Sequence, residues 1–510
     1  MPDSGAQGAV IEFLSRPESY GAGIDRVERI DTHGAIVFLA GDRVYKLKRA
    51  VRYPYMDYST LDRRRAMCEA EIAINRRTAP QLYLDAVPVT RDGGALRIDG
   101  DGTPVDWLVV MRRFDQACLF DRLAAQGRLT PDLMRELAQA IASFHDAAER
   151  RPAYGGADGI AWVIDGNRTG LQEAGPAMFA PDAVAAFDAG CRAWLARVGP
   201  LLDTRRSRGF VRRCHGDLHL RNICLLDGRP VLFDAIEFSE DIASIDTMYD
   251  FAFLLMDLER RRLRPLGNAA LNAYLAGTGD LDGLSPLPLF LACRAGVRAQ
   301  VGAAASHAQP DPARRAALMA EARETLALGL SFLSPPPARM IAVGGLSGTG
   351  KSTVARALAP DLGRSPGAVV LRSDEIRKRH AGVAPTVRLG PEAYTPEASS
   401  RVYAAMLEAA RLVAAAGQVV ILDAVFAKPE ERAAAAQAAR EAGVAFTGLW
   451  LEAPPERLKT RIASRSGDAS DATVEVLARQ LTFDLGPIDW SRIEVSGPVA
   501  DSVAAARRLI

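Results

Sequence analysis

The sequence predicts two fold classes in one chain, an α+β bilobal fold followed by an α/β fold with a doubly wound parallel sheet. Three observations predict this: residues up to about 115 are rich in strand-like segments and those from Leu129 to 333 are mostly helical, residues 338–510 alternate strands with helices, and prolines interrupt the chain between the two parts. We therefore expect a first domain over residues 1–333 with a small lobe to about residue 115, a Pro-rich linker over 334–339 and a second domain over 340–510.

The small lobe contains six segments with the β-branched and aromatic composition of strands, namely VERIDTH, AIVFLAG, DRVYKLKR, YLDAVPVT, GALRIDG and DWLVVMRRF. Between them, residues Thr60–Thr78 have the apolar spacing of a single amphipathic helix. Helices dominate afterwards, as in LTPDLMRELAQAIASFHDAAER and TMYDFAFLLMDLERRRL. A strand-rich small lobe followed by a helical large lobe resembles a bilobal protein-kinase-like domain.

Composition limits the partners that this chain is expected to have. Its 63 Lys and Arg residues nearly balance 62 Asp and Glu residues, so no global field favours nucleic acid or an anionic membrane. The six cysteines form no CxxC pair, and the N-terminus lacks a basic start followed by an apolar stretch, which together indicate a cytoplasmic protein with reduced thiols. No run of about 18 apolar residues predicts a membrane span.

The first motif is His215–Asn222, HGDLHLRN, in which Asn222 follows Asp217 by five positions and Asp234 comes twelve positions later. Phosphoryl transfer requires a carboxylate that positions the acceptor and oxygen ligands for Mg²⁺ around the triphosphate. Asp217 is therefore the candidate catalytic residue, and Asn222 and Asp234 are candidate metal ligands. The segment ICLLDGRPVLFDAIEF predicts a hairpin with an Asp-Gly turn, which brings Asn222 and Asp234 onto neighbouring backbone segments.

This motif and its spacing resemble the aminoglycoside phosphotransferase and choline kinase family. The resemblance implies that Lys46 contacts the nucleotide phosphates, with Lys48 as the rival assignment. It also implies that Glu71 is the ion-pair partner of this lysine, with Glu69 less favoured, and that Asp250 braces the catalytic loop.

The loop between the first two strands departs from the kinase pattern, because only Thr32-His33-Gly34 stands where protein kinases have a glycine-rich loop. Few backbone amides are then available to cover the phosphates. Two interpretations stay open, a small-molecule kinase and a degenerate domain that binds nucleotide without turnover. The large lobe also offers acidic residues for a cationic acceptor of the kind this family often binds: Asp241, Asp246, Asp257 and Glu259.

The second motif is a complete Walker A sequence, GLSGTGKS, between the strand-like MIAVG and the helical STVARALAPDL. Its glycines let backbone N–H groups converge on phosphate oxygens, and the helix N-terminus adds a favourable dipole. Lys351 is expected to bridge the β and γ phosphates, and the Ser352 hydroxyl to bind Mg²⁺. The candidate nucleotide-binding residues here are Gly345, Ser347, Gly348, Thr349, Gly350, Lys351, Ser352 and Thr353.

The next two predicted strands end in Asp374 and Asp423. A carboxylate at the end of the strand after the P-loop helix lies across the cleft from the γ-phosphate, so Asp374 is the candidate catalytic base, although it can also cap the following helix. This arrangement resembles the P-loop kinases that include gluconate kinase, polynucleotide kinase and zeta-type toxins. The resemblance implies that Arg377 clamps the acceptor or a phosphate and that Asp423 completes the metal shell.

A basic segment near the C-terminus resembles the lid of such kinases. Arg457, Arg461 and Arg465 are four residues apart, so they share one helical face and could close over the triphosphate. Arg461 and Arg465 are the favoured nucleotide contacts, and a solvated basic stripe is the alternative.

Together, the motifs predict an ATP-dependent phosphotransferase with two Mg-ATP sites, each moving the γ-phosphate to a hydroxyl of an unidentified small-molecule acceptor. One alternative makes the first domain a regulatory pseudokinase that controls an active P-loop kinase. Another has the P-loop domain phosphorylate nucleic-acid ends, which the neutral charge balance does not support.

Overall fold

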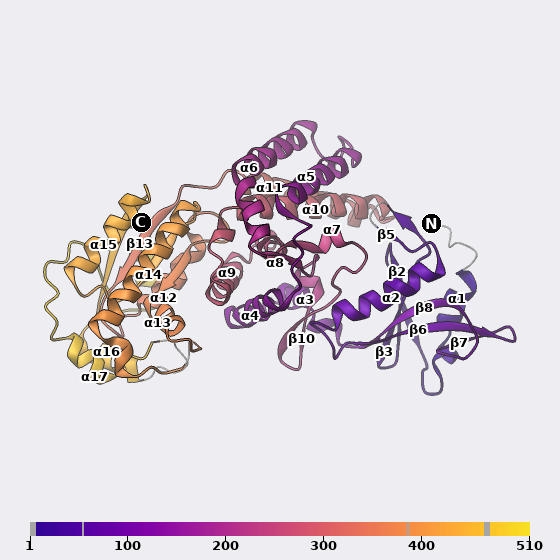
Figure 1. The fold of residues 1–510 in the computed structure, drawn as a ribbon, viewed down its shortest axis with the longest axis horizontal. Coiled ribbons are helices and arrows are strands. Elements are labelled where there is room, and N and C mark those ends of the chain that lie inside the picture. The colour runs from indigo at the N-terminus through magenta and orange to yellow at the C-terminus, as the bar shows by residue number, and fades with distance from the viewer. Residues whose placement is uncertain (1–6, 54–55, 385–386, 464–469) are drawn as a thin grey trace. The chain divides into compact units, whose positions relative to one another are not determined.

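A computed structural model of the protein describes residues 7–53, 56–384, 387–463 and 470–510, and these divide into two compact units (Figure 1). The first unit consists of Met1–Val163 and Gly199–Asp257, and the second of Ile164–Val198 and Leu258–Ile510. The second unit therefore combines the P-loop part of the chain with helices that come before the Pro-rich segment. The boundaries of the two compact units do not lie at residues 334–339.

The first unit contains an antiparallel sheet of six strands in the order β1-β2-β3-β8-β6-β7. Each of the six strand-like segments of the small lobe forms one of these strands, so that prediction is confirmed. The strands are β1 (Val27–Asp31), β2 (Ala35–Ala40), β3 (Arg43–Lys48), β6 (Tyr83–Asp92), β7 (Ala95–Ile98) and β8 (Thr103–Arg112). Helix α1 (Gly8–Leu14) adds apolar side chains to the core on one face of this sheet.

Strand β3 divides its side chains between the two faces of the sheet. Tyr45 and Leu47 are buried in the core that α1 shares, and the lysines between and after them point to the other face. Helix α2 (Leu61–Asn75) covers that other face, where Cys68 and Ile72 pack against β6 and β8 (Figure 1). The helix ends at Asn75, earlier than predicted, in turns that lead to Pro80, which cannot continue a helix.

The rest of the first unit is mainly helical and contains the HGDLHLRN loop. Its helices include α3 (Phe120–Ala125), α4 (Pro131–Ala147), α7 (Glu240–Ala243) and α8 (Thr247–Arg260), with two small antiparallel pairs, β9 (Val211–Arg213) with β12 (Ser244–Asp246) and β10 (Ile223–Leu226) with β11 (Arg229–Leu232). Asp227 and Gly228 join β10 to β11 with φ angles of 51° and 78°. Positive φ at both central residues is the type I′ geometry that an Asp-Gly pair favours, so the predicted hairpin is confirmed.

The second unit contains a parallel sheet of five strands in the order β14-β15-β13-β16-β17. Its strands are β13 (Arg339–Gly344), β14 (Val369–Arg372), β15 (Val420–Asp423), β16 (Ala445–Glu452) and β17 (Ser491–Glu494). The helices between them include α12 (Lys351–Leu358), α13 (Ser373–His380), α14 (Pro396–Ala415), α15 (Pro429–Glu441), α16 (Pro455–Ala463) and α17 (Val474–Gln480), and α18 (Val499–Arg507) follows the last strand. This all-parallel sheet confirms the predicted α/β class.

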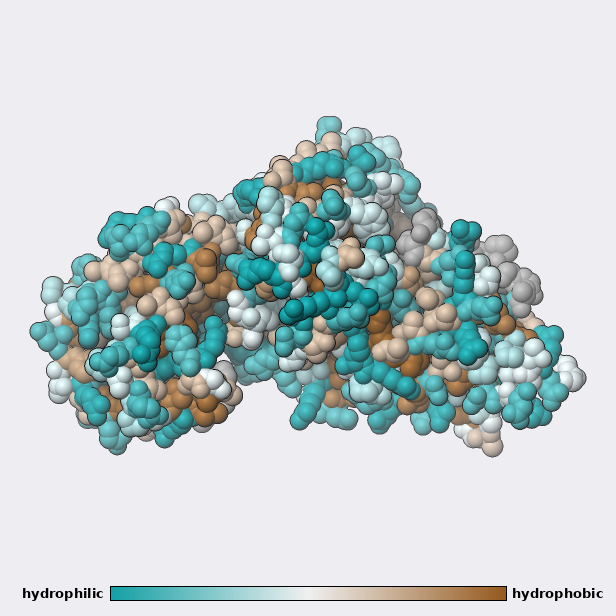
Figure 2. Space-filling model, viewed as in Figure 1, coloured by the Kyte–Doolittle hydropathy of each residue, from teal (hydrophilic) through white to brown (hydrophobic). Residues whose placement is uncertain are grey.

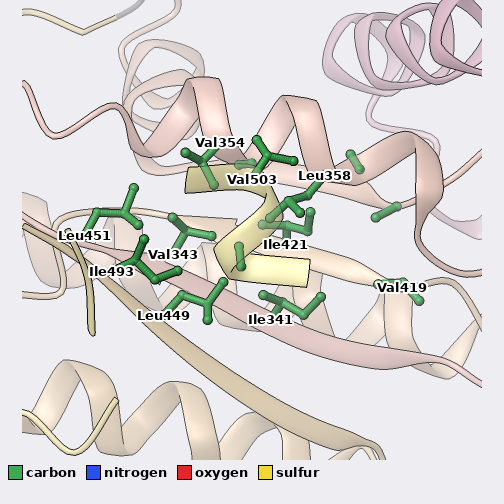
Figure 3. Close-up of a cluster of buried hydrophobic side chains, with 14 of the residues drawn as sticks. Ile341, Val343, Val354, Leu358, Val419, Ile421, Leu449, Leu451, Ile493 and Val503 are labelled. Carbon is green, nitrogen blue, oxygen red and sulfur yellow. The ribbon is translucent and has the colours of Figure 1, made fainter. Parts of the chain in front are cut away.

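One face of the parallel sheet is sealed by aliphatic side chains (Figure 3). Ile341, Val343 and Ile421 on the central strands pack against Val354 and Leu358 of α12, and all five are almost completely buried. This packing fixes the N-terminus of α12, and with it the P-loop, against the carboxyl ends of the strands.

The second unit also contains long helices from the middle of the chain: α9 (Arg264–Thr278), α10 (Leu287–Ala308) and α11 (Pro312–Phe332). Helices α5 (Gly156–Glu173) and α6 (Pro181–Ser207) contribute residues to both units. Figure 2 shows hydrophilic residues over much of the visible surface, with hydrophobic residues in smaller separate areas. Among the described residues, no helix combines the length and apolar character needed to span a bilayer.

Candidate active sites

In the first unit, Lys46 on β3 joins two carboxylates that are far apart in the sequence. Its Nζ atom lies 2.9 Å from Glu71 Oε1 on α2 and 2.8 Å from Asp234 Oδ1 after β11. Burial alone would lower the pKa of Lys46, but the charges of Asp234 and Glu71 outweigh it and raise that pKa well above its ordinary value. Lys46 therefore stays positively charged. Glu69, the less favoured partner, pairs instead with Arg65 on the exposed side of α2.

The rival lysine is part of the same cluster. Lys48 Nζ lies 2.6 Å from Glu71 Oε2 and also pairs with Glu237, and only 1% of its side chain is exposed. The Tyr58 hydroxyl donates a hydrogen bond to Glu237 as well. Glu71 thus binds both lysines, but Lys46 is the one that also contacts Asp234 and keeps 20% of its side chain exposed. The sequence reasoning missed Glu237, which lies only three residues after Asp234.

Asp234 has an unusual backbone conformation, with a φ angle of 61°. Two contacts hold it: its N–H donates to the Tyr83 hydroxyl at 3.0 Å, and the next N–H, of Ala235, donates to the Asn75 side-chain oxygen at 2.7 Å. Asn75 is one turn after Glu71 on α2. The same helix therefore orients both the partner of Lys46 and the segment that carries Asp234.

The catalytic loop brings Asp217 and Asn222 together. The Asn222 side-chain nitrogen donates to Asp217 Oδ2 at 2.8 Å and to the Asp217 backbone oxygen at 2.9 Å, so its own side-chain oxygen is the atom that can face a cation. His219 Nε2 lies 3.4 Å from Asp217 Oδ2. The hairpin joins Asn222 to the strand before Asp234, because the Phe233 N–H donates to the Asn222 backbone oxygen at 3.0 Å.

Asp250 on α8 lies beneath this loop and is completely buried. Its carboxylate accepts hydrogen bonds from the N–H groups of His215, at 3.1 Å, and Gly216, at 2.8 Å, and lies 3.0 Å from His145 Nε2. Burial lowers the pKa of His215, whose Nε2 atom lies 2.9 Å from the Phe233 backbone oxygen. These contacts agree with the bracing position expected for Asp250.

Two of the four acidic residues considered for a cationic acceptor, Asp246 and Asp257, have internal partners instead. Asp246 forms a buried two-atom ion pair with Arg205, at 2.8 and 2.9 Å, and Asp257 accepts a hydrogen bond from the Leu220 N–H at 3.2 Å. Both carboxylates therefore stabilise the fold around the catalytic loop.

In the second unit, the P-loop runs from β13 into α12 with the close backbone approach that its glycines allow. A Cβ atom at Gly345, where φ is 136°, would lie 2.5 Å from the Leu451 backbone oxygen, and one at Gly348, where φ is 85°, would lie 2.9 Å from the Leu458 oxygen. Any other residue at either position would strain the loop. Lys351 Nζ donates to the Leu346 backbone oxygen at 3.1 Å, which holds its ammonium group over the loop.

The P-loop opens into a pocket of about 1330 Å³. Lys351, Ser352, Asp374, Arg377 and Asp423 all line it, so most of the site predicted from sequence gathers around one cavity. Ligand pockets are typically about 300–1,000 Å³, which makes this one large enough for a nucleotide together with a second molecule. Burial raises the pKa of Asp374 above its ordinary value, and the nearby charge of Asp423 acts in the same direction.

Only 8% of Arg377 is exposed, yet its Nε atom has no hydrogen-bond partner among the described residues. Its guanidinium lies over the Tyr394 ring, 4.6 Å from the centroid, and it donates to the Ala393 backbone oxygen. Arg377 follows Asp374 by one helical turn of α13. A buried cation with an unused donor beside the candidate base is suited to an anionic group on a ligand.

Arg372, which the sequence reasoning did not consider, connects the two candidate metal ligands of this pocket. Its guanidinium lies 3.2 Å from Asp423 Oδ2, 3.2 Å from Ser352 Oγ and 2.7 Å from Glu375 Oε1. The side chain is 4% exposed, and it ends the strand that leads to Asp374. The Ser352 hydroxyl and the Asp423 carboxylate therefore lie around one positively charged group. Both are oxygen ligands of the kind that Mg²⁺ prefers, so these two residues fit a magnesium ion.

The lid region approaches the P-loop from two helices. Arg461 on α16 lies 3.5 Å from the Gly348 backbone oxygen and 3.3 Å from the Val495 oxygen, and Gln480 on α17 accepts a hydrogen bond from the Ser347 N–H at 2.8 Å. Gln480 was also missed from the sequence. Arg465 lies outside the described residues, so its predicted contact stays a prediction.

Comparisons with known proteins also assign the two motifs to two different domains. The model of the phosphotransferase enzyme family matches residues 40–287, and that of an AAA domain matches residues 340–483. An uncharacterized protein of Mycobacterium tuberculosis is 31% identical over 489 residues, which cover 93% of this chain and 94% of the relative, and an uncharacterized protein of Mycobacterium bovis has the same identity and coverage. The chain belongs to their family.

Solved structures resemble one half of this family's chain or the other. A choline/ethanolamine kinase family protein from Mesorhizobium loti is 14% identical with a TM-score of 0.39 and covers 64% of this chain and 99% of its own. A sugar kinase from a Janibacter species is 23% identical with a TM-score of 0.26 and covers 34% of this chain and 94% of its own. The two domain models, and not these structures, show that the chain joins a kinase-like phosphotransferase domain to a P-loop domain, and together they support a kinase-like function that uses ATP.

Proposed function

We propose that the protein is a phosphotransferase with two Mg-ATP sites, each of which transfers a γ-phosphate to a hydroxyl of a small molecule. The observation that carries this proposal is that each unit gathers its own complete set of polar groups. Lys46, Glu71 and Asp234 meet beside the loop of Asp217 and Asn222 in the first unit, and the P-loop, Asp374 and Asp423 line one pocket in the second.

In the first site, Lys46 contacts the phosphates while Glu71 fixes its position. Asp217 orients the acceptor hydroxyl and accepts its proton, and Asn222 supports that carboxylate through the 2.8 Å contact. Asn222 and Asp234 would hold Mg²⁺, which neutralises charge on the phosphate oxygens when bound. The hydrogen bonds between Thr32 and Ala35 close the short loop between β1 and β2 on itself, so few loop amides are offered to the phosphates.

In the second site, the P-loop amides and Lys351 bind the phosphates, and the Ser352 hydroxyl and Asp423 would hold the metal. Asp374 accepts the proton of the acceptor hydroxyl. Burial raises the pKa of Asp374, which makes its carboxylate a stronger proton acceptor than that of an exposed aspartate. The free donor of Arg377 favours a small acceptor that carries an anionic group.

The test measures γ-phosphate transfer in the full chain with two single substitutions. With labelled ATP and a metabolite extract, Asp217→Ala should remove one set of labelled products, with a rate loss of about 10²- to 10⁴-fold, and Lys351→Ala should remove the other. Asp132→Ala, at the start of α4 where 93% of the side chain is exposed, is the control and should change neither set.

Two outcomes would overturn parts of this proposal. If either substitution stopped all ATP consumption, the two sites would not be independent. If the first site bound ATP but labelled no product in any variant, the regulatory pseudokinase would be the better description. Labelled nucleic-acid ends in place of small molecules would support the remaining alternative.

A further inference from the structure

Strand β14 lies at one edge of the parallel sheet, and its outward-facing backbone groups have partners on helix α9. The Val369 N–H points inward and donates to the Val419 oxygen beside β15, at 2.9 Å. Backbone groups alternate along a strand, so the Ala368 oxygen and the Val370 N–H face the open edge. Such groups are costly when they are buried without partners.

One side chain satisfies both of these edge groups. The Asn272 side-chain oxygen accepts from the Val370 N–H at 2.7 Å, and its nitrogen donates to the Ala368 oxygen at 3.2 Å. A neighbouring parallel strand would offer one N–H and one carbonyl at this position. The amide of Asn272 thus reproduces one residue of a sixth strand. Asn268, one turn earlier and 4% exposed, donates to the same Ala368 oxygen at 3.0 Å.

Further contacts fix α9 to the segments on both sides of β14. Arg264 Nη2 donates to the Gly363 oxygen at 2.7 Å before the strand, and Arg379 at the end of α13 donates to the Ala276 oxygen at 3.2 Å. The segment from residue 363 to 379 contains Arg372, Asp374 and Arg377. Helix α9 therefore holds the whole strand-helix unit that supplies one wall of the P-loop pocket.

We propose that α9, although it comes before the Pro-rich segment, is a structural part of the P-loop kinase site, and that Asn272 is a positioning residue for Arg372 and Asp374. The inference rests on the proposed function for the catalytic consequence, but the brace itself rests on the contacts alone. Arg372, whose guanidinium reaches Asp423 and Ser352, is two positions after Val370 on the same strand. Loss of the Asn272 contacts would let the strand shift along the edge and misalign these groups.

The experiment compares amide hydrogen exchange in the full chain for the wild type and Asn272→Leu. Leucine has the same number of side-chain heavy atoms, the same branching and a higher helix propensity, so α9 itself is not weakened. We expect peptides that cover Ala368–Arg372 to exchange about tenfold faster in the variant, since a lost hydrogen bond changes local opening by that order. In the same exchange experiment, the concentration of AMP-PNP that gives half-maximal protection of the P-loop peptide should rise. In a separate activity assay, kcat of the P-loop site should fall by a larger factor than KM for ATP changes.

The control is Ile493→Ala on β17, at the opposite edge of the same sheet, where a 3% exposed side chain is shortened. This variant lowers stability without removing a contact of α9, so it should speed β14 exchange less than Asn272→Leu does. Equal exchange of Ala368–Arg372 in wild type and Asn272→Leu would overturn the proposal, as would equally fast exchange in the Ile493→Ala control. If AMP-PNP protected no P-loop peptide even in the wild type, the proposed kinase function would fail while the exchange comparison still decided the brace.

Discussion

At the level of single residues, the sequence predicted which side chains belong to each motif, but it did not predict which other side chains they contact. The spacing of Asp217, Asn222 and Asp234 predicted a set of groups that the structure brings to one loop and hairpin, because spacing in a hairpin fixes which residues become neighbours. The direction of Arg372 could not be predicted. A strand alternates its side chains, but which pair of oxygens the guanidinium reaches depends on one other strand, β15, and on helix α12, which are separate from β14 in the sequence.

Asp374 gives a prediction that separates catalysis from stability. Its raised pKa means that the ionised carboxylate is less favourable in the folded protein than in the unfolded chain, so folding stability should fall as pH rises through the raised pKa. Asp374→Asn removes that cost. We expect the variant to lose P-loop turnover by about 10²- to 10⁴-fold and to unfold at a higher temperature at neutral pH.

Thermal unfolding of both proteins across the acidic-to-neutral range checks this. The gain in melting temperature should shrink as pH falls below the raised pKa, because the wild-type carboxyl is then protonated too. Over the same range, the wild-type rate should rise with pH as Asp374 becomes able to accept a proton. Asp489→Asn, at an exposed position, is the control and should change neither property. A stability gain that did not depend on pH would contradict the assignment.

Packing between elements decided the choices that the sequence had left open. Both lysines of β3 face α2, so alternation alone could not choose between Lys46 and Lys48, and both in fact contact Glu71. The difference comes from what each lysine meets beyond the helix: Asp234 for Lys46, and Glu237 for Lys48. That difference depends on the path of the chain after β11, which no local pattern in β3 or α2 encodes.

The paired lysines predict an indirect effect of Glu237 on nucleotide binding. In Glu237→Gln, Lys48 keeps only Glu71 as an anionic partner, so it should draw Glu71 away from Lys46. We expect KM for ATP at the first site to rise about three- to tenfold, with a smaller change in kcat, since the loss of one buried partner weakens ground-state phosphate binding. Steady-state kinetics of the full chain measure this.

Glu69→Gln is the matched control for that substitution. Glu69 is on the same helix, but it pairs with Arg65 at the surface, where more than half of both side chains is exposed, so its neutralisation should leave KM unchanged. Equal effects of the two substitutions would mean that net charge, and not the buried network, controls ATP binding.

Local patterns in the sequence describe the fold class of each part better than they describe which helices group with which sheet. The fold classes of both parts could be predicted from periodicity and motifs, because these are local signals. The grouping of α9, α10 and α11 with the parallel sheet could not, since three prolines mark a change of chain direction but not which surfaces pack together. Asn272 gave no signal of its own, because an Asn within a helical pattern has many roles.

The proposal of one nucleotide site in each compact unit predicts how the full chain titrates with nucleotide. Because the groups of each site lie wholly within one unit, we expect AMP-PNP with Mg²⁺ to bind with two equivalents in isothermal titration calorimetry. Lys46→Ala and Lys351→Ala should each leave one equivalent, and the double variant none, because a lysine on phosphate supplies a strong charge-assisted contact at either site.

Arg77→Ala is the control that tests whether the loss of any positive charge has the same effect. Arg77 lies in the first unit and donates to the backbone oxygens of Arg213 and Cys214, so its removal should keep both equivalents. A single equivalent in the unaltered protein would contradict the two-site proposal directly, whereas two equivalents that both vanished with one substitution would show that one site must be filled before the other can bind.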